Sequence, residues 1–164
     1  MGNHLEANEE LDFISARKRS HPDVLELRWN IYAKERKWDA CADIGLAIMK
    51  AAPARPFGWI HRSFALHRLK RTEEAFSNLA HVGQKFYENW TVQYNLACYC
   101  SVLHRFDESK SWFKRAMLLD EKKTQRVGID DPDLLPLWDS MSGTIWSKDA
   151  TIGEINSGGG TRGA

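Results

Sequence analysis

Residues 90–123 read WTVQYNLACYCSVLHRFDESKSWFKRAMLLDEKK and carry the clearest structural signal in the chain. Each half has apolar residues at helical spacing, first Tyr94, Leu96, Ala97 and Cys100, then Trp112, Phe113, Ala116, Met117 and Leu119. The segment 104–108 interrupts the pattern between the two halves. Because a period near 3.6 with a central break is typical of two helices joined by a tight turn, we predict a helical hairpin.

The same pattern recurs twice upstream without gaps, in segments 56–89 and 22–55. The twentieth position of the three segments holds a small residue that suits a close crossing of two helices: Cys41, Ala75 and Ser109. Pro22 and Pro56 each open a segment, and proline is tolerated at the start of a helix because that N–H has no intrahelical partner. Three registers that agree at one period predict a helical repeat array.

Segment 90–123 resembles the tetratricopeptide repeat, and the matching residues are Trp90, Leu96, Ala97, Cys100, Phe106, Asp107, Glu108, Phe113 and Ala116. The resemblance extends over residues 22–123. It implies an all-α fold, a right-handed superhelical solenoid of antiparallel helix pairs that serves as a protein-binding scaffold. Trp29 and Ser63 depart from the family, which prefers Gly or Ala at their position, and Ile48 and Val82 are bulkier than its usual Ala. We therefore expect the first two hairpins to be splayed.

We expect a single domain over residues 1–146, followed by a flexible Gly-rich tail at 147–164. Segment 5–20 has one apolar side, with acidic residues before basic ones, which predicts an amphipathic N-terminal helix. We expect this helix to cover the first repeat, since end repeats need a covering element. Docking on a partner is the alternative.

A C-terminal capping helix is expected over residues 131–142. Asp131 before Pro132 is a favourable pair of N-cap and first-turn residues, and an apolar stretch follows that Pro136 interrupts. In the alternative interpretation, this segment enters the binding groove as a self-peptide.

The composition predicts a cytoplasmic protein. The net charge of +1 gives no bulk electrostatic reason to bind nucleic acid or a membrane. Three cysteines are too few for a disulfide framework. The first ten residues have no apolar run after a basic start, so we expect no signal peptide. No stretch approaches the roughly 18 apolar residues of a membrane span.

The sequence predicts neither an enzyme nor a metal or cofactor site. Cys98 and Cys100, two residues apart on a predicted helix, point to different faces. His61 and His67 have no further ligand in register for zinc. Motifs for a nucleophilic serine, a phosphate loop or a dinucleotide are missing.

The resemblance implies that the first helices of successive repeats line a concave groove. The residues that it places there, which we take as the candidate binding site, are Asn30, Lys34, Phe57, Ile60, Phe64, His67, Arg68, Tyr94 and Cys98. The middle of this set is apolar and aromatic with basic flanks, and aromatic and arginine side chains dominate binding energy at interfaces. Alternatively, the apolar members pack under the chain's own terminal helices.

The expected function is a non-catalytic module that binds a peptide or protein segment in this groove. The known tetratricopeptide clamp for the chaperone tail Glu-Glu-Val-Asp is absent, because Glu26 and Thr91 replace its two lysines. Three repeats with a leading helix also resemble the class II translocator chaperones of type III secretion, although those tend to be acidic. Self-association is compatible with either function.

A run of basic residues without any acid extends from Ile44 to Thr72 and consists of Lys50, Arg55, Arg62, Arg68, Lys70 and Arg71. This basic segment could attract an acidic or carboxylate-bearing peptide, or form a solvated outer edge. It also raises single-stranded RNA as an alternative ligand, which the near-zero net charge makes less favourable.

Overall fold

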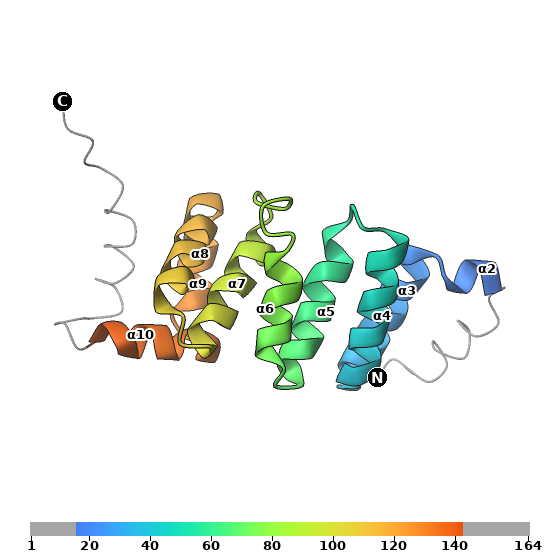
Figure 1. The fold of residues 1–164 in the computed structure, drawn as a ribbon, viewed down its shortest axis with the longest axis horizontal. Coiled ribbons are helices and arrows are strands. Elements are labelled where there is room, and N and C mark those ends of the chain that lie inside the picture. The colour runs from blue at the N-terminus through green and yellow to red at the C-terminus, as the bar shows by residue number, and fades with distance from the viewer. Residues whose placement is uncertain (1–15, 143–164) are drawn as a thin grey trace, which may run out of the picture. The chain divides into compact units, whose positions relative to one another are not determined.

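The computed structural model describes residues 16–142, and this part of the chain contains helices and turns but no strand (Figure 1). In chain order the elements are α2 (Ala16–Arg19), α3 (Pro22–Lys34), α4 (Trp38–Ala51), α5 (Pro56–Arg68), α6 (Thr72–Ala80), α7 (Trp90–Val102), α8 (Phe106–Leu119), α9 (Glu121–Gly128), the 3-10 helix η1 (Pro132–Leu134) and α10 (Leu135–Ser142). The prediction of an all-α protein is confirmed for these residues.

The helices belong to two compact units, one ending at Val82 and the other beginning at Gly83. In the first unit α3 packs on α4, α4 on α5 and α5 on α6. In the second unit α7 packs on α8, and the later elements pack on this pair. The single domain expected over residues 1–146 stays a prediction.

Paired helices recur at the 34-residue interval of the sequence pattern. The first helices α3, α5 and α7 begin at Pro22, Pro56 and Trp90, and each has 13 residues. Their partners α4, α6 and α8 begin at the same offset within each pair. Both prolines thus occupy the first turn of a helix, where no N–H is needed.

Each first helix ends in the same kind of turn. Arg36, Lys70 and His104 have positive φ angles of 57°, 65° and 57°, a conformation common just after a helix C-terminus. The N–H of Arg36 donates to the carbonyl three residues back, and the N–H of Lys37 donates to the carbonyl of Tyr32. Equivalent pairs of hydrogen bonds follow α5 and α7. These are Schellman motifs closed by residues other than glycine, which pay a steric cost of about 1–2 kcal/mol.

In the first unit, helices α4 and α5 approach each other closely at two glycines. A Cβ atom added to Gly45 would lie 2.7 Å from Cβ of Arg62, and one added to Gly58 would lie 2.8 Å from the backbone nitrogen of Met49. The core around this contact is fully or nearly fully buried and includes Cys41, Ile48, Ala65, Leu66, Ala75 and Leu79. The two backbones can therefore approach this closely only because both positions are glycine, which has no side chain.

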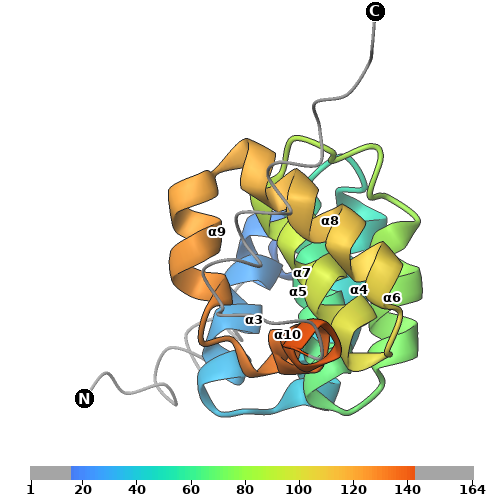
Figure 2. The ribbon, with the colours of Figure 1, turned by 90° about the vertical axis from the view of Figure 1, so that its left-hand side faces the viewer.

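In the second unit, the C-terminal elements cover the α7–α8 pair. Helix α9 packs on α8, and α10 packs on both α7 and α8 (Figure 2). Leu134 and Leu137 have no solvent exposure. The indole nitrogen of Trp138 donates to the carbonyl of Gly128 at 3.0 Å. Leu134, Leu137 and Trp138 are therefore part of the core of the unit.

The structure describes the expected C-terminal helix but only part of the expected N-terminal helix. Of the helix expected at 5–20, the short helix α2 and Ser20 are described, whereas residues 5–15 and the tail at 147–164 lie outside the described residues. The segment 131–142 contains η1 and α10, with Asp131 as the N-cap of η1. Pro136 is the second residue of α10 and does not interrupt it, because an N–H in the first turn has no intrahelical partner.

Candidate functional site

Aromatic rings from three helices of the first unit form one cluster. This aromatic cluster consists of Trp29 from α3, Trp38 from α4, and Phe57, His61 and Phe64 from α5. The Trp29 ring meets the other rings edge-on, with centroid distances of 4.4 Å to His61, 6.1 Å to Phe57 and 6.5 Å to Phe64. Phe57 stacks on His61 at 3.7 Å, and Trp38 lies 5.7 Å from Phe64. Edge-to-face and stacked contacts of this kind are favourable and fix the rings relative to one another.

Helix periodicity explains which rings reach the surface. Phe57, His61 and Phe64 are spaced by four and three residues, so they share one face of α5. Trp29 is 5% exposed and forms the floor of the cluster, whereas Phe64 is 38% exposed. The indole nitrogen of Trp29 is buried and has no hydrogen-bond partner among the described residues. The cluster therefore offers an apolar surface at Phe64 on a buried aromatic base.

His61 is held in one protonation state by its surroundings. Its Nδ1 lies 2.9 Å from the carbonyl oxygen of Phe57. Because a carbonyl only accepts, Nδ1 carries the proton and donates. Burial lowers the pKa of the imidazole below its ordinary value, and the hydrogen bond to Phe57 opposes this in part. Near neutral pH His61 is thus an uncharged ring of the cluster.

A basic side chain, that of Arg68, borders the exposed part of the cluster. The guanidinium of Arg68 lies 5.5 Å from the centre of the Trp38 ring, within range of a cation–π interaction. Lys34, the last residue of α3, is exposed. Among the described residues neither side chain has a carboxylate within ion-pair distance. At the start of α3, by contrast, the Arg55 guanidinium lies 2.7 Å from the Asp23 carboxylate.

Every candidate residue from the sequence can be located. Asn30, Lys34, Phe64 and Arg68 are exposed, Phe57 and His67 are half-buried, and Ile60 is buried. Nδ1 of His67 lies 3.0 Å from the hydroxyl of Thr72. The structure therefore brings Phe57, Phe64 and Arg68 together around the two tryptophans and turns Ile60 into the core.

Tyr94 and Cys98, the candidates in the second unit, are covered by the chain itself. Their exposed fractions are 5% and 4%. The Tyr94 hydroxyl donates to Oδ2 of Asp131 at 2.7 Å, and the thiol of Cys98 lies 3.8 Å from the same oxygen. The backbone N–H of Leu137 donates to the hydroxyl of Ser101 at 3.1 Å. On this face of α7, residues 131–137 occupy the surface that the resemblance assigned to a ligand.

The described residues offer little for nucleophilic or metal chemistry. Burial raises the pKa of the Cys41 thiol to about 11. Burial also raises the pKa of Cys98, and the nearby carboxylate of Asp131 adds to this effect. Such thiols stay protonated and are poor nucleophiles. Between residues 16 and 142 no group of three or more His, Cys, Asp or Glu side chains could hold a metal ion. Nor is any described helix long and apolar enough to cross a membrane.

The sequence matches no protein-family model and no curated protein.

Sequence reasoning did not assign Trp29, Trp38 or His61 to the candidate site. Trp29 stands where the resemblance expects a small residue. That departure is itself a signal, because a large ring at a close helix crossing has to be accommodated by its neighbours. Its position in the core of the first unit makes it the common partner of Phe57, His61 and Phe64.

Proposed function

We propose that this chain is a non-catalytic, tetratricopeptide-like module that binds a peptide or protein segment through the aromatic cluster of its first unit. The observation that carries the proposal is the exposure of Phe64, at 38%, above a buried and rigid aromatic base. Exposed aromatic side chains that are already fixed by their neighbours lose little conformational entropy on binding. The 34-residue recurrence of helix pairs and Schellman turns supports the tetratricopeptide-like character.

The surroundings of Phe64 favour a segment that carries both an apolar side chain and a carboxylate. An apolar side chain would contact Phe64 and the neighbouring Trp38 ring. A carboxylate would be attracted by Arg68, which has no ion-pair partner in the described part of the chain. Because this cation is exposed, it would contribute mainly to orientation and association rate rather than to affinity.

RNA binding along the basic segment is a weaker proposal. Two of its arginines already have carboxylate partners in the first unit. Arg55 contacts Asp23 at 2.7 Å, and Arg71 contacts Glu74 at 2.6 Å. A phosphate backbone would have to compete with these acids for the guanidinium groups.

The proposed function can be tested by immobilising the wild-type protein and its variants and comparing which proteins each one captures from a lysate of the source cells. The Phe64→Ala variant should fail to capture a protein that the wild type captures. Leu118→Ala is the matched control, because Leu118 is a still more exposed leucine on α8, at 76%. Equal capture by all three proteins, with unchanged helicity and melting, would contradict binding through Phe64. Tyr94 is unsuitable for this purpose because its substitution would disturb the packing of the second unit.

A further inference from the structure

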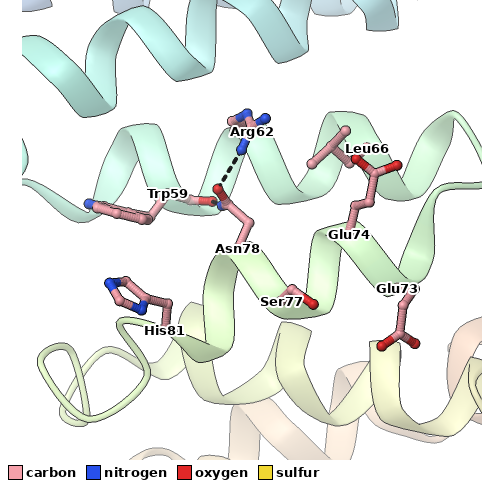
Figure 3. A pocket seen from close by; sticks show the side chains of 8 residues that line it. All are labelled: Trp59, Arg62, Leu66, Glu73, Glu74, Ser77, Asn78 and His81. Atoms are coloured by element: carbon pink, nitrogen blue, oxygen red, sulfur yellow. Dashed lines mark hydrogen bonds between the residues drawn. The ribbon is translucent and has the colours of Figure 1, made fainter.

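A pocket of about 410 Å³ in the first unit lies apart from Phe64 and is formed by α5, α6 and the residue after α6. Trp59 and His81 stand at one end of the pocket, Glu73 and Glu74 stand at the other, and Arg62 and Asn78 lie between them (Figure 3). The ring centroids of Trp59 and His81 are 6.1 Å apart. The pocket thus combines an aromatic end, a central cation and an acidic end.

Arg62 is held firmly in the middle of this pocket. Its Nη1 donates to Oδ1 of Asn78 at 2.8 Å (Figure 3). Asn78 is itself oriented, because its Nδ2 donates to the carbonyl of Trp59 at 3.2 Å and to the hydroxyl of Ser63 at 2.8 Å. The stem of Arg62 is fixed against α4 by the close approach of Gly45. A guanidinium with its stem and one donor fixed is preorganised for a ligand.

The guanidinium of Arg62 has no direct ion-pair partner within the described residues, although the carboxylate of Glu74 interacts with it electrostatically. Its Nε is buried without a hydrogen-bond partner, and no carboxylate lies within ion-pair distance. Arg71 provides the contrast, because its Nε and Nη2 donate to the two carboxylate oxygens of Glu74 at 2.6 and 2.7 Å. Glu74 is therefore already engaged by another arginine. A half-buried guanidinium without a directly bonded anion is costly, and an anion bound to its Nη nitrogens would offset part of that cost.

We propose that this pocket binds a singly charged organic carboxylate that carries an apolar group. The carboxylate would accept hydrogen bonds from the Nη nitrogens of Arg62, in the fork geometry that suits guanidinium and carboxylate. The apolar group would contact the ring of Trp59, which is fixed because its Nε1 donates to the carbonyl of Pro53 at 3.2 Å. The acids Glu73 and Glu74 at the far end disfavour phosphates and polyanions.

Two sources of such a carboxylate exist, the C-terminus of a polypeptide and a small carboxylic acid. N-acetyl-L-leucine mimics a chain end, 4-methylpentanoate is a small acid with the same apolar group, and N-acetyl-L-leucinamide lacks the charge. Each compound is titrated into the full chain, and its binding is measured from the changes in the amide signals of residues 77–81 and in the indole signal of Trp59. We expect both acids to bind at least about tenfold more tightly than the amide, because charged hydrogen bonds are the stronger ones. Tighter binding of the acetylated acid would assign a chain end, and equal binding of the two acids would assign a small acid. Equal binding of acid and amide would overturn the proposal.

Two variants with matched controls locate the site. Arg62→Gln should abolish the preference for the acids, whereas Lys70→Gln, which removes the same charge from an exposed position, should not. Ser77→Glu places a carboxylate at an exposed position on the pocket lining, so it should weaken binding of the acids but not of the amide. This second variant leaves Arg62 and its hydrogen bond to Asn78 unchanged. Ser111→Glu on α8 is its control. If acid binding survived Arg62→Gln in folded protein, or survived Ser77→Glu, the assignment would be wrong. Neither variant alters Phe64, so this test and that of the proposed function can fail separately.

Discussion

The hydroxyl of Tyr94 on α7 donates a 2.7 Å hydrogen bond to Oδ2 of Asp131 in the segment that follows α9. Oδ1 of the same carboxylate accepts from the backbone N–H of Asp133 at 2.9 Å and so begins η1. The Trp90 ring stacks on Tyr94 at 4.7 Å, and Nζ of Lys123 lies 3.7 Å from the centre of the Trp90 ring. One carboxylate thus both starts the C-terminal element and fastens it to α7.

Tyr94→Phe should reveal how much this fastening contributes to stability. The substitution keeps the ring and removes a hydrogen bond from a buried side chain to a half-buried carboxylate, so we expect the free energy of unfolding to fall by about 2 kcal/mol. Tyr87→Phe is the control, because its hydroxyl also donates to a carboxylate, that of Glu88 at 2.8 Å, but the side chain is exposed. Urea unfolding followed by circular dichroism measures both. Similar losses in the two variants would mean that burial of the Tyr94–Asp131 contact adds nothing.

The Schellman turns predict a stabilising substitution. Lys70 has a φ of 65°, which glycine adopts without the steric cost that other residues pay. Lys70→Gly should therefore raise the free energy of unfolding by up to about 1 kcal/mol, since part of the gain is offset by the greater freedom of glycine in the unfolded chain. Lys50→Gly, at an exposed position in the last turn of α4, should have the opposite sign and a smaller size. Thermal melting of the two variants beside wild type distinguishes the outcomes, and a loss of stability in both would contradict the expectation.

The helix pairs could be predicted from the sequence because their signals are local. Pro22 and Pro56 mark helix starts, and the apolar stripes mark the buried faces, so the period alone defines each pair. The turns also repeat, but their positive φ angles could not be predicted from the residue types Arg36, Lys70 and His104. The two hydrogen bonds that close each helix impose this conformation. The division between Val82 and Gly83 has no local signal.

The candidate site was less predictable because it depends on contacts between distant segments. Phe64 and Arg68 lie near the surface, as their place on α5 suggested. Cys98 has on α7 the place that Phe64 has on α5, 34 residues earlier, yet it is buried, because the segment that contains Asp131 lies against it. The sequence left open whether the groove is filled by a terminal segment. Spacing within a helix determines which residues share a face, but not which other segment covers that face.

Stability should depend on pH through His61. Burial lowers its pKa in the folded protein below the ordinary value of 6.5, so the unfolded chain binds the proton more readily. The contribution of neutral His61 is therefore fully present above pH 6.5 and is lost as the pH falls from there toward the lower folded value. In His61→Phe, which keeps an aromatic ring but cannot titrate, the urea midpoint should fall less between pH 7 and pH 5 than in wild type. Identical pH slopes in wild type and His61→Phe would contradict the prediction.

Gly45→Ala should destabilise the first unit even though alanine favours helices. In an open helix the substitution would gain about 1 kcal/mol from helix propensity. Here the added Cβ would lie 2.7 Å from Cβ and 2.9 Å from Cα of Arg62, so α4 and α5 would have to move apart. Forcing a group into a packed contact costs typically about 1–3 kcal/mol, and backbone atoms cannot yield as the end of a side chain can. We therefore expect a net loss of stability on urea unfolding, together with shifts in the amide signals of α5 around Arg62.

Asp43→Ala, at an exposed position on the same helix, should change stability little. A Gly45→Ala protein as stable as wild type would mean that the two helices can separate at little cost, and that Arg62 is not held in place by α4.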